Sequence, residues 1–335
     1  MLTTVLSAHD LAIGYRSGRA FTTIHQGLSF TLYGGELTCL LGANGCGKST
    51  LLRTLAASQP ALGGEINLMG KPMNRYTGRE LSRTIGIVLT DKTQAGGLTV
   101  YELVALGRQP HTGFFGRLEE HDHRRIEAAL QSVGVAHKAA AYVASLSDGE
   151  RQKVFIAKAL VQECPLILLD EPTAFLDVVS RIEIMNLLRR LAAEEKRAIL
   201  LSTHDVEQAL TLADRLWLLS PTKGLQCGNT EDMVLSGRMN DLFERGNLNF
   251  DPRTGTYHPR VQGARSIQVE AIDDLLLHRS TAALQRMGYR CLPADDVVSE
   301  DTPRLRVDSP TALHLNKDGV AQTYDSFEAL AVALR

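Results

Sequence analysis

Gly42-Ala43-Asn44-Gly45-Cys46-Gly47-Lys48-Ser49-Thr50 follows the apolar run LTCLL (37–41) and precedes the helical pattern LLRTLAA (51–57). This is the phosphate-binding P-loop pattern in the strand, loop and helix setting that it requires. Glycines let successive backbone N–H groups turn toward a polyphosphate, and the new helix adds unpaired amides and the positive end of its dipole. Lys48 is expected to place a charge on the outer phosphates, and Ser49 a hydroxyl on Mg²⁺. The pattern therefore predicts a polyphosphate site formed by Gly42, Asn44, Gly45, Gly47, Lys48, Ser49 and Thr50.

A second motif, PLILLDEPT (165–173), is predicted to complete this site. Its four apolar residues form a buried strand, and Asp170 follows at the carboxyl end, where open α/β sheets bind ligands. We expect Asp170 to hold Mg²⁺, directly or through water. Glu171 is then placed to accept a proton from the water that attacks a γ-phosphate.

The composition is that of an ordinary folded protein of about two domains. The 335 residues carry 36 Lys plus Arg and 38 Asp plus Glu, and this balance of charge predicts no nucleic-acid partner. Five scattered cysteines without a CxxC pair argue against a disulfide framework or a zinc site. No apolar run reaches the roughly 18 residues of a membrane helix, and the start lacks the basic region of a signal peptide. We expect the chain to stay in the compartment where it is made.

Short apolar runs alternate with amphipathic stretches along most of the chain, which predicts a parallel α/β fold. A turn-rich stretch (249–265) then reads as a hairpin followed by a linker. The predicted domains are a nucleotide-binding domain over 1–250 with a helical part at about 95–160, a hairpin and linker over 251–262, and an accessory α/β module over 263–335. The expected buried strands are 37–42, 85–89, 166–170, 198–203 and 216–220, and the expected helices are about 48–57, 120–134, 148–163 and 182–195.

Three further motifs lie in a fixed order around the second one. Leu146-Ser147-Asp148-Gly149-Glu150 opens a helix before PLILLDEPT, and Leu176-Asp177 and His204-Asp205 follow it. Together with the P-loop, this order resembles the ATP-binding subunit of ATP-binding cassette transporters over about residues 5–245. The resemblance implies a P-loop NTPase cassette, with a RecA-like parallel core, an N-terminal antiparallel β part and a helical subdomain.

The resemblance also implies ATP hydrolysis with Mg²⁺ in a head-to-tail homodimer. The signature segment of one copy would cover the ATP held by the P-loop of the other. Ser147 and the Gly149 amide would contact the γ-phosphate of the facing nucleotide, Asp177 would tie the two sites together, and His204 would act as the switch histidine. Tyr15 would stack on adenine, although an aromatic residue near a strand end also serves as ordinary core or surface filler.

Two departures from the family pattern bear on the mechanism. Where the family usually has a glutamine that ligates Mg²⁺, the matching position is Thr90, followed by Asp91. Their oxygens could still serve the metal shell, but with a shorter reach. In the signature, Asp148 replaces a usual glycine and Glu150 a usual glutamine. Because a carboxylate beside a triphosphate repels it, we expect these two side chains to face away or to cap their own helix.

The stretch 99–135 resembles the helical insert of ATPases that serve bacterial importers of ferric siderophores, haem and vitamin B12. It implies a peripheral subunit on the cytoplasmic face of the cell membrane. The implied partners are two polytopic permease subunits and, indirectly, an extracytoplasmic substrate-binding protein. Each permease would insert a coupling helix in a groove beside residues 90–115, with Glu102, Arg108 and Phe114 as candidates for its rim.

Two other readings of the motifs stay open. One is a cassette ATPase without a permease, such as an iron–sulfur cluster assembly ATPase, which is also a single cassette without membrane spans. The other is a nucleotide-sensing regulator whose output lies in the C-terminal module. The sequence of that module offers no recognisable chemistry.

Overall fold

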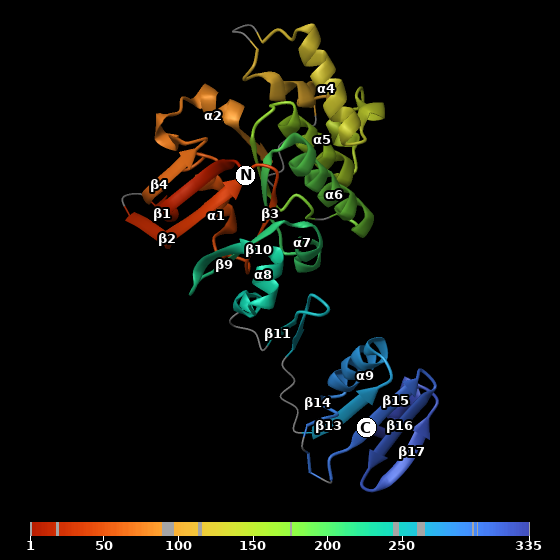
Figure 1. The fold of residues 1–335 in the computed structure, drawn as a ribbon. Coiled ribbons are helices and arrows are strands. Elements are labelled where there is room, and N and C mark those ends of the chain that lie inside the picture. The colour runs from red at the N-terminus through yellow and green to blue at the C-terminus, as the bar shows by residue number, and fades with distance from the viewer. Residues whose placement is uncertain are drawn as a thin grey trace. The chain divides into compact units, whose positions relative to one another are not determined.

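The computed structural model describes residues 2–17, 20–88, 97–112, 116–174, 176–243, 248–259, 265–296, 298–299 and 301–334 (Figure 1). The chain divides into two compact units. The first comprises Met1–Arg245 with Phe250–Tyr257, and the second Gly246–Asn249 with His258–Arg335. No helix in the described ranges is both long enough and apolar enough to cross a bilayer.

A six-stranded sheet forms the centre of the first unit, in the order β10-β9-β3-β8-β7-β6. Five neighbouring strands run parallel, and β10 joins the edge antiparallel to β9. The strands are β3 (Leu37–Leu41), β6 (Ile85–Val88), β7 (Leu166–Asp170), β8 (Ala198–Ser202), β9 (Arg215–Ser220) and β10 (Gly224–Asn229).

Alternate residues of each central strand enter two different cores, which is why the strands are apolar throughout. In β7, Leu166 and Leu168 pack on one face of the sheet, whereas Ile167 and Leu169 pack on the other. The first core contains α1 (Lys48–Leu55) and an antiparallel sheet; the second contains most of the other helices of the unit. The predicted buried strands and the α/β class are confirmed, with boundaries within a residue or two.

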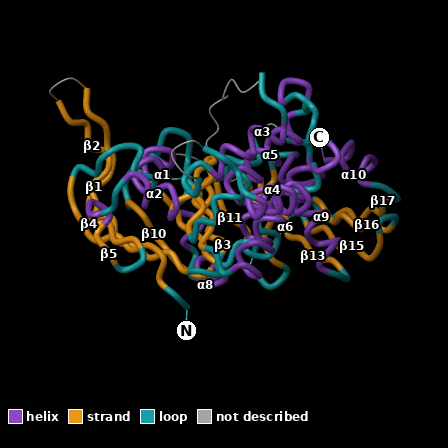
Figure 2. Tube along the Cα trace, turned by 90° about the horizontal axis from the view of Figure 1, so that it is seen from above, coloured by secondary structure: helices purple, strands orange, loops and turns teal. Residues whose placement is uncertain are grey.

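The antiparallel sheet has the order β2-β1-β4-β5 and lies on one side of the central sheet, while α3, α4, α5 and α6 lie on the other (Figures 1 and 2). Its strands are β1 (Thr4–Ser17), β2 (Ala20–Tyr33), β4 (Gly63–Leu68) and β5 (Lys71–Pro72). The helices are α2 (Gly78–Thr84), α3 (Val100–Ala105), α4 (Glu120–Ser132), α5 (Asp148–Leu160), α6 (Val178–Glu195), α7 (Val206–Leu212) and α8 (Thr230–Leu235), with short 3₁₀ turns that include η2 (Leu106–Arg108) and η5 (Arg238–Asp241).

The turn-rich stretch forms a hairpin of β11 (Leu248–Asp251) and β12 (Thr256–Pro259). Phe250 of this hairpin is buried in the core of the first unit, and Tyr257 packs against that core. The hairpin therefore packs onto the first unit, although the sequence alone grouped it with a linker.

The second unit is a five-stranded sheet in the order β14-β13-β15-β16-β17 with two helices. Residues from both helices and four of the strands share one core, which includes Ile267, Leu284 and Leu330. Its elements are β13 (Arg265–Ala271), α9 (Asp274–Arg286), β14 (Tyr289–Pro293), β15 (Arg304–Ser309), β16 (Ala312–Lys317), β17 (Val320–Tyr324) and α10 (Phe327–Leu334).

Candidate nucleotide site

The P-loop joins β3 to α1 and has the backbone that phosphate binding requires. Gly45 and Gly47 have φ angles of 77° and 106°, a left-handed conformation that glycine adopts without strain. A Cβ on Gly42 would lie 2.4 Å from Cys46 Sγ and 2.7 Å from the Leu219 carbonyl oxygen, so a larger residue would disturb the loop. Gly47 also has no side chain to cap α1, which leaves the first-turn amides available to an anion.

Lys48 lies across this loop. Its side chain is 6% exposed, and Nζ donates to the carbonyl oxygens of Gly42 (2.8 Å) and Ala43 (3.3 Å). The two carbonyl groups therefore hold the ammonium beside the first two residues of the loop, a position that suits the binding of phosphate oxygens. Ser49, the next residue, is exposed and free to present its hydroxyl group to a ligand.

A serine without a sequence signal, Ser202, bonds both acidic residues at the end of β7: the carboxylate of Asp170 and the backbone amide of Glu171. Asp170 is buried at the end of β7, and Ser202 Oγ donates to its Oδ1 at 2.6 Å. The same Oγ accepts the Glu171 N–H at 2.9 Å. Glu171 has a φ of 46°, so this hydrogen bond stabilises a backbone conformation that a non-glycine residue rarely adopts.

Glu171 and His204 face each other beside the P-loop. His204 Nδ1 lies 3.8 Å from Glu171 Oε2, and the histidine side chain is 63% exposed. A cavity of about 340 Å³ brings these two residues together with the start of the P-loop. Its lining is Leu41, Gly42, Ala43, Asn44, Glu171, Thr203, His204, Val206, Leu242 and Phe243.

The signature segment forms a capping box at the start of α5. Ser147 Oγ accepts the Glu150 N–H at 3.3 Å, and the Glu150 carboxylate accepts the Ser147 N–H at 3.0 Å. Lys138 also lies 2.5 Å from Glu150 Oε1. Its hydrogen bond, with that of the Ser147 amide, lowers the pKa of Glu150 to about 2. Glu150 thus caps its own helix, as the sequence suggested, and Asp148 forms an ion pair with Arg151 of the same helix.

Asp177 caps the neighbouring helix α6. Its Oδ1 accepts the Ser180 N–H at 2.9 Å, and this bond lowers the pKa of Asp177. The two caps are adjacent, because a Cβ on Gly149 would lie 3.2 Å from Ser180 Oγ. Arg181, another residue without a sequence signal, donates to the Leu176 carbonyl and to Asp205, and so links the segment before α6 to the segment after His204.

The remaining predicted residues lie outside this cavity. Tyr15 lies on β1 and is 54% exposed. Thr90 and Phe114 lie outside the described residues. Glu102 is exposed, but its carboxylate accepts the Thr99 N–H in the capping box of α3.

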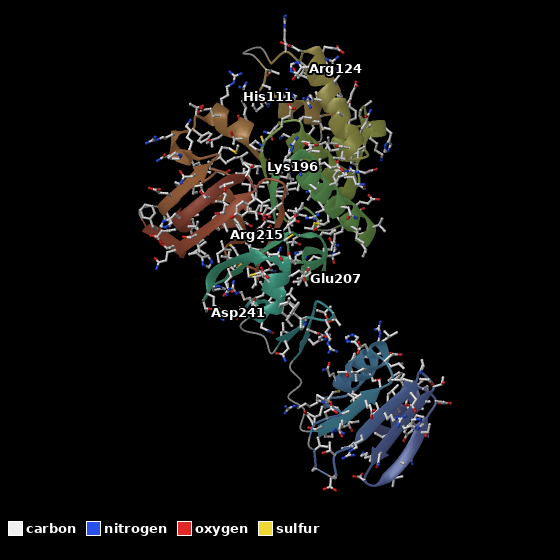
Figure 3. All side chains as sticks on the ribbon, viewed as in Figure 1. His111, Arg124, Lys196, Glu207, Arg215 and Asp241 are labelled. Carbon is white, nitrogen blue, oxygen red and sulfur yellow. The ribbon has the colours of Figure 1, made fainter. Side chains whose placement is uncertain are left out.

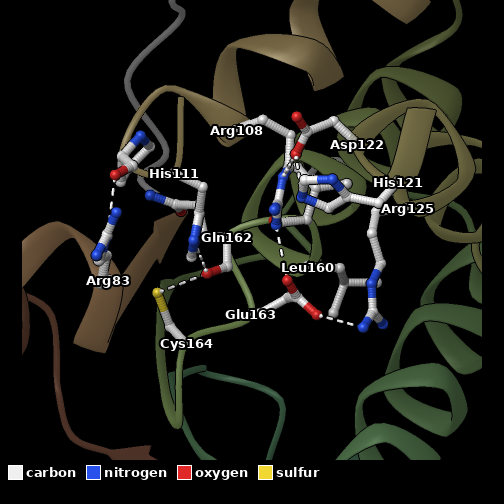
Figure 4. A network of polar contacts seen from close by, with 12 residues as sticks. Arg83, Arg108, His111, His121, Asp122, Arg125, Leu160, Gln162, Glu163 and Cys164 are labelled. Carbon is white, nitrogen blue, oxygen red and sulfur yellow. Dashed lines mark hydrogen bonds and ion pairs between the residues drawn. The ribbon is translucent and has the colours of Figure 1, made fainter. Parts of the chain in front are cut away.

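Placing Arg108 on a groove rim was wrong, because its side chain is 2% exposed. Arg108 donates to Asp122 of α4 (2.7 Å) and to Glu163 in the turn after α5 (2.8 Å). Figure 4 shows this network, which Arg125 and His121 extend. Burial raises the pKa of Asp122, but hydrogen bonds from the Glu119 amide and Arg108 outweigh it and lower that pKa overall. Arg108 therefore joins the helical insert to α5.

A hollow of about 700 Å³ lies at the surface of the helical part. Its lining includes two cationic side chains, Arg79 and Lys158, and burial lowers the pKa of Lys158. The other lining residues are Gly78, Ser82, Leu106, Gln109, Pro110, Thr112, Gly116 and Gln162.

Comparison with known proteins agrees with this geometry. The family model described as ABC transporter matches residues 25–174. The iron(3+)-hydroxamate import ATP-binding protein FhuC of Bacillus subtilis is 36% identical over 74% of this chain and 91% of its own length. The ferric enterobactin transport ATP-binding protein FepC of Escherichia coli is 36% identical over 72% and 86%. The solved structure of cbiO1 from Clostridium perfringens, part of the ABC transporter complex cbiONQ, matches with a TM-score of 0.62 at 28% identity, over 76% of this chain and 98% of that one.

The matches cover 91% and 86% of these two relatives, and the match to the family model spans the P-loop, Asp170 and Glu171. The chain belongs to the ABC transporter family, as one of its ATP-binding-cassette ATPases.

Proposed function

We propose that this ATPase powers a bacterial importer of iron chelates of the siderophore type, with haem or cobalamin as the alternative cargo. The observation that carries the proposal is the cavity that the start of the P-loop shares with Glu171 and His204, in a chain 36% identical to ATP-binding proteins of iron(3+)-hydroxamate import and of ferric enterobactin transport. ATP-dependent closure of a homodimer would drive a membrane permease between its two states.

Within one chain, the P-loop amides and Lys48 would hold the phosphates. Ser49 and Asp170, with Thr90 as a further candidate, would hold Mg²⁺, which neutralises phosphate charge when bound. Ser49 is exposed and Asp170 is oriented by Ser202, so both fit this role. Glu171 would accept the proton of the attacking water, and His204 would contact the γ-phosphate.

A second copy would complete each site. Ser147 and the Gly149 amide, at the start of α5, would cover the nucleotide of the partner, and Asp177 would connect the two sites. Tyr15 is the candidate for stacking on adenine. We assign the second unit an accessory role, as an added dimer contact or a stabilising module, within the domain limits predicted from the sequence.

Two polytopic permease subunits are the proposed partners, at the cytoplasmic face of the membrane, with an extracytoplasmic binding protein that acts through them. The hollow lined by Arg79 and Lys158 is the proposed binding site of the permease segment, because its lining includes Leu106, Gln109, Pro110 and Thr112 of the helical part. An iron–sulfur assembly ATPase or a nucleotide-sensing regulator would need no such binding site.

Purification from solubilised membranes tests transport against these alternatives. We expect the full-length chain to copurify with a polytopic protein and to hydrolyse ATP with Mg²⁺. Recovery only with soluble scaffold proteins would favour iron–sulfur assembly and contradict the transport proposal.

Lys48→Ala tests the cradle itself. The substitution removes a buried cation that two loop carbonyls hold in place, and we expect ATP affinity to fall at least about tenfold. Equilibrium binding of a fluorescent ATP analogue measures this loss. Unchanged binding would contradict the assignment of the P-loop as the phosphate site.

A further inference from the structure

One side of the catalytic cavity is apolar. Val206, Leu242 and Phe243 form this apolar side, and Glu171 and His204 line the same cavity. Leu242 is buried, and Phe243 packs against the same core. Leu242 and Phe243 directly follow η5, so their position depends on what holds η5 and the residues after it.

The hairpin of β11 and β12 contacts both η5 and Phe243. The Tyr257 ring packs edge-on against Phe243, with 4.8 Å between ring centroids, and lies 5.1 Å from the Phe250 ring. Tyr257 Oη donates to the Met239 carbonyl oxygen at 2.5 Å, and the Phe250 N–H donates to Asn240 Oδ1 at 3.0 Å. Burial raises the pKa of Tyr257, so the hydroxyl keeps its proton for this bond.

The turn of the hairpin also contacts α7, whose first residue, Val206, lines the same apolar side of the cavity. A Cβ on Gly255 would lie 3.1 Å from Leu210 Cδ1, so this turn touches α7. That helix begins at Val206, two residues after His204. The hairpin therefore contacts the two elements next to the apolar side of the cavity, η5 and α7. Figure 3 labels one residue of each, Asp241 of η5 and Glu207 of α7.

We propose that the hairpin braces the catalytic cavity and that Tyr257 is a positioning residue for ATP hydrolysis. Tyr257 acts through Phe243 and the Met239 carbonyl, and thereby fixes the apolar residues that line the cavity together with Glu171 and His204. These apolar residues limit where the attacking water and the histidine side chain can lie. The inference rests on the proposed catalytic roles of Glu171 and His204.

A brace of this kind affects turnover more than binding. Small errors in the placement of reacting groups reduce rates strongly, by as much as about a hundredfold for a displacement of 1 Å. Nucleotide binding depends mainly on the P-loop amides and Lys48. The expected signature is a lower kcat with an unchanged dissociation constant for ATP.

The test uses three variants of the full-length chain. Tyr257→Phe keeps the ring and removes only the bond to Met239, and we expect kcat to fall about two- to fivefold. Tyr257→Ala also removes the ring from Phe243, and we expect a fall of more than about tenfold. Tyr324→Phe in the second unit is the matched control, because its hydroxyl bonds only Gln322 in the structure described, and its kcat should be unchanged.

Steady-state hydrolysis gives kcat, and ATP binding in the presence of EDTA gives the dissociation constant and the number of competent sites. Wild-type kcat in Tyr257→Ala would overturn the inference, as would losses of kcat and of binding sites in equal proportion, which indicate misfolding. A graded loss of kcat across the two variants, with full binding, supports it. If the unsubstituted protein binds no ATP, the proposed function fails before the brace is tested.

Discussion

Ser202 is a small residue with two acidic neighbours. Its hydroxyl donates to Asp170 and accepts the amide of Glu171, so one side chain orients both the proposed metal ligand and the proposed base. Ser202 is fully buried, and no water is needed to complete this arrangement. Its loss would leave the Glu171 amide without its partner at a strained φ angle.

We predict that Ser202→Ala lowers kcat by about tenfold, since Glu171 is no longer held by its amide. The free energy of unfolding should fall by about 1–3 kcal/mol, the cost of an unsatisfied buried group. Hydrolysis assays and urea unfolding measure the two effects. Ser236→Ala, which removes a peripheral helix-end hydroxyl, is the control. Wild-type kcat in Ser202→Ala would show that Glu171 keeps its position without the serine.

The sequence predicted Lys48, Asp170 and Glu171 because each belongs to a contiguous motif, whereas Ser202 and Arg181 carry no local pattern. Ser202 meets Asp170 only because β7 and β8 pair in parallel with these two residues in register. Arg181 becomes informative only when α6 is packed beside the segment after β8. Such roles depend on contacts between segments that are distant in sequence.

At the scale of elements, helix α5 begins with a charged capping box. Its start carries the Ser147 and Glu150 capping box, and Lys138 neutralises the Glu150 carboxylate. Because the folded pKa of Glu150 is lowered from 4.5 to about 2, its stabilising contribution is full above pH 4.5 and is lost as the pH falls toward 2. At neutral pH the carboxylate is therefore charged, and Lys138 offsets its repulsion of a nucleotide.

Lys138→Met should expose this charge to the facing nucleotide. We predict that the MgATP concentration for half-maximal hydrolysis rises about two- to fivefold, in line with a partly exposed ion pair. The double variant with Glu150→Gln keeps the capping geometry without the charge, and it should return to the wild-type value. An unchanged MgATP dependence in Lys138→Met would mean that the start of α5 does not face a nucleotide.

Arg108 connects η2, α4 and the turn after α5 by a buried ion pair with Asp122 and a part-buried one with Glu163. Arg108→Met leaves the carboxylates of Asp122 and Glu163 without this partner, and we predict a loss of about 3–5 kcal/mol in the free energy of unfolding. Arg125→Met is the control, because Arg125 also pairs with Glu163 but is 60% exposed, and it should cost no more than about 1 kcal/mol. Equal losses in urea unfolding would contradict a special role for the buried pairs.

Periodicity predicted the existence of α4 and α5, but not that Arg108 would be enclosed between them. An arginine in a charged, helical stretch is usually at the surface, and burial required Asp122, Glu163 and the Val161 carbonyl to converge on one guanidinium group. The sequence defines the elements more reliably than the polar contacts between them.

At the scale of the whole molecule, one chain would supply both halves of the proposed nucleotide site without bringing them together. The described cavity is lined by the start of the P-loop, Glu171 and His204, whereas the signature segment at α5 lines no part of it. Two copies related by a twofold axis would each place α5 over the nucleotide of the other. The stability of such a dimer would depend on the bound γ-phosphates, so hydrolysis would reopen it.

Glu171→Gln separates binding from hydrolysis in this cycle. The amide cannot accept the proton of the attacking water, so turnover should fall by about 10²–10⁴-fold, while the P-loop, Lys48 and Ser49 still bind MgATP. The closed dimer should then persist, and light scattering with MgATP should give twice the 36.6 kDa mass of one chain. The wild-type protein, which consumes its ATP, should return to the monomer. Rapid hydrolysis by the variant would remove Glu171 from its role, and a monomeric variant saturated with MgATP would show that the bound nucleotide does not hold two copies together.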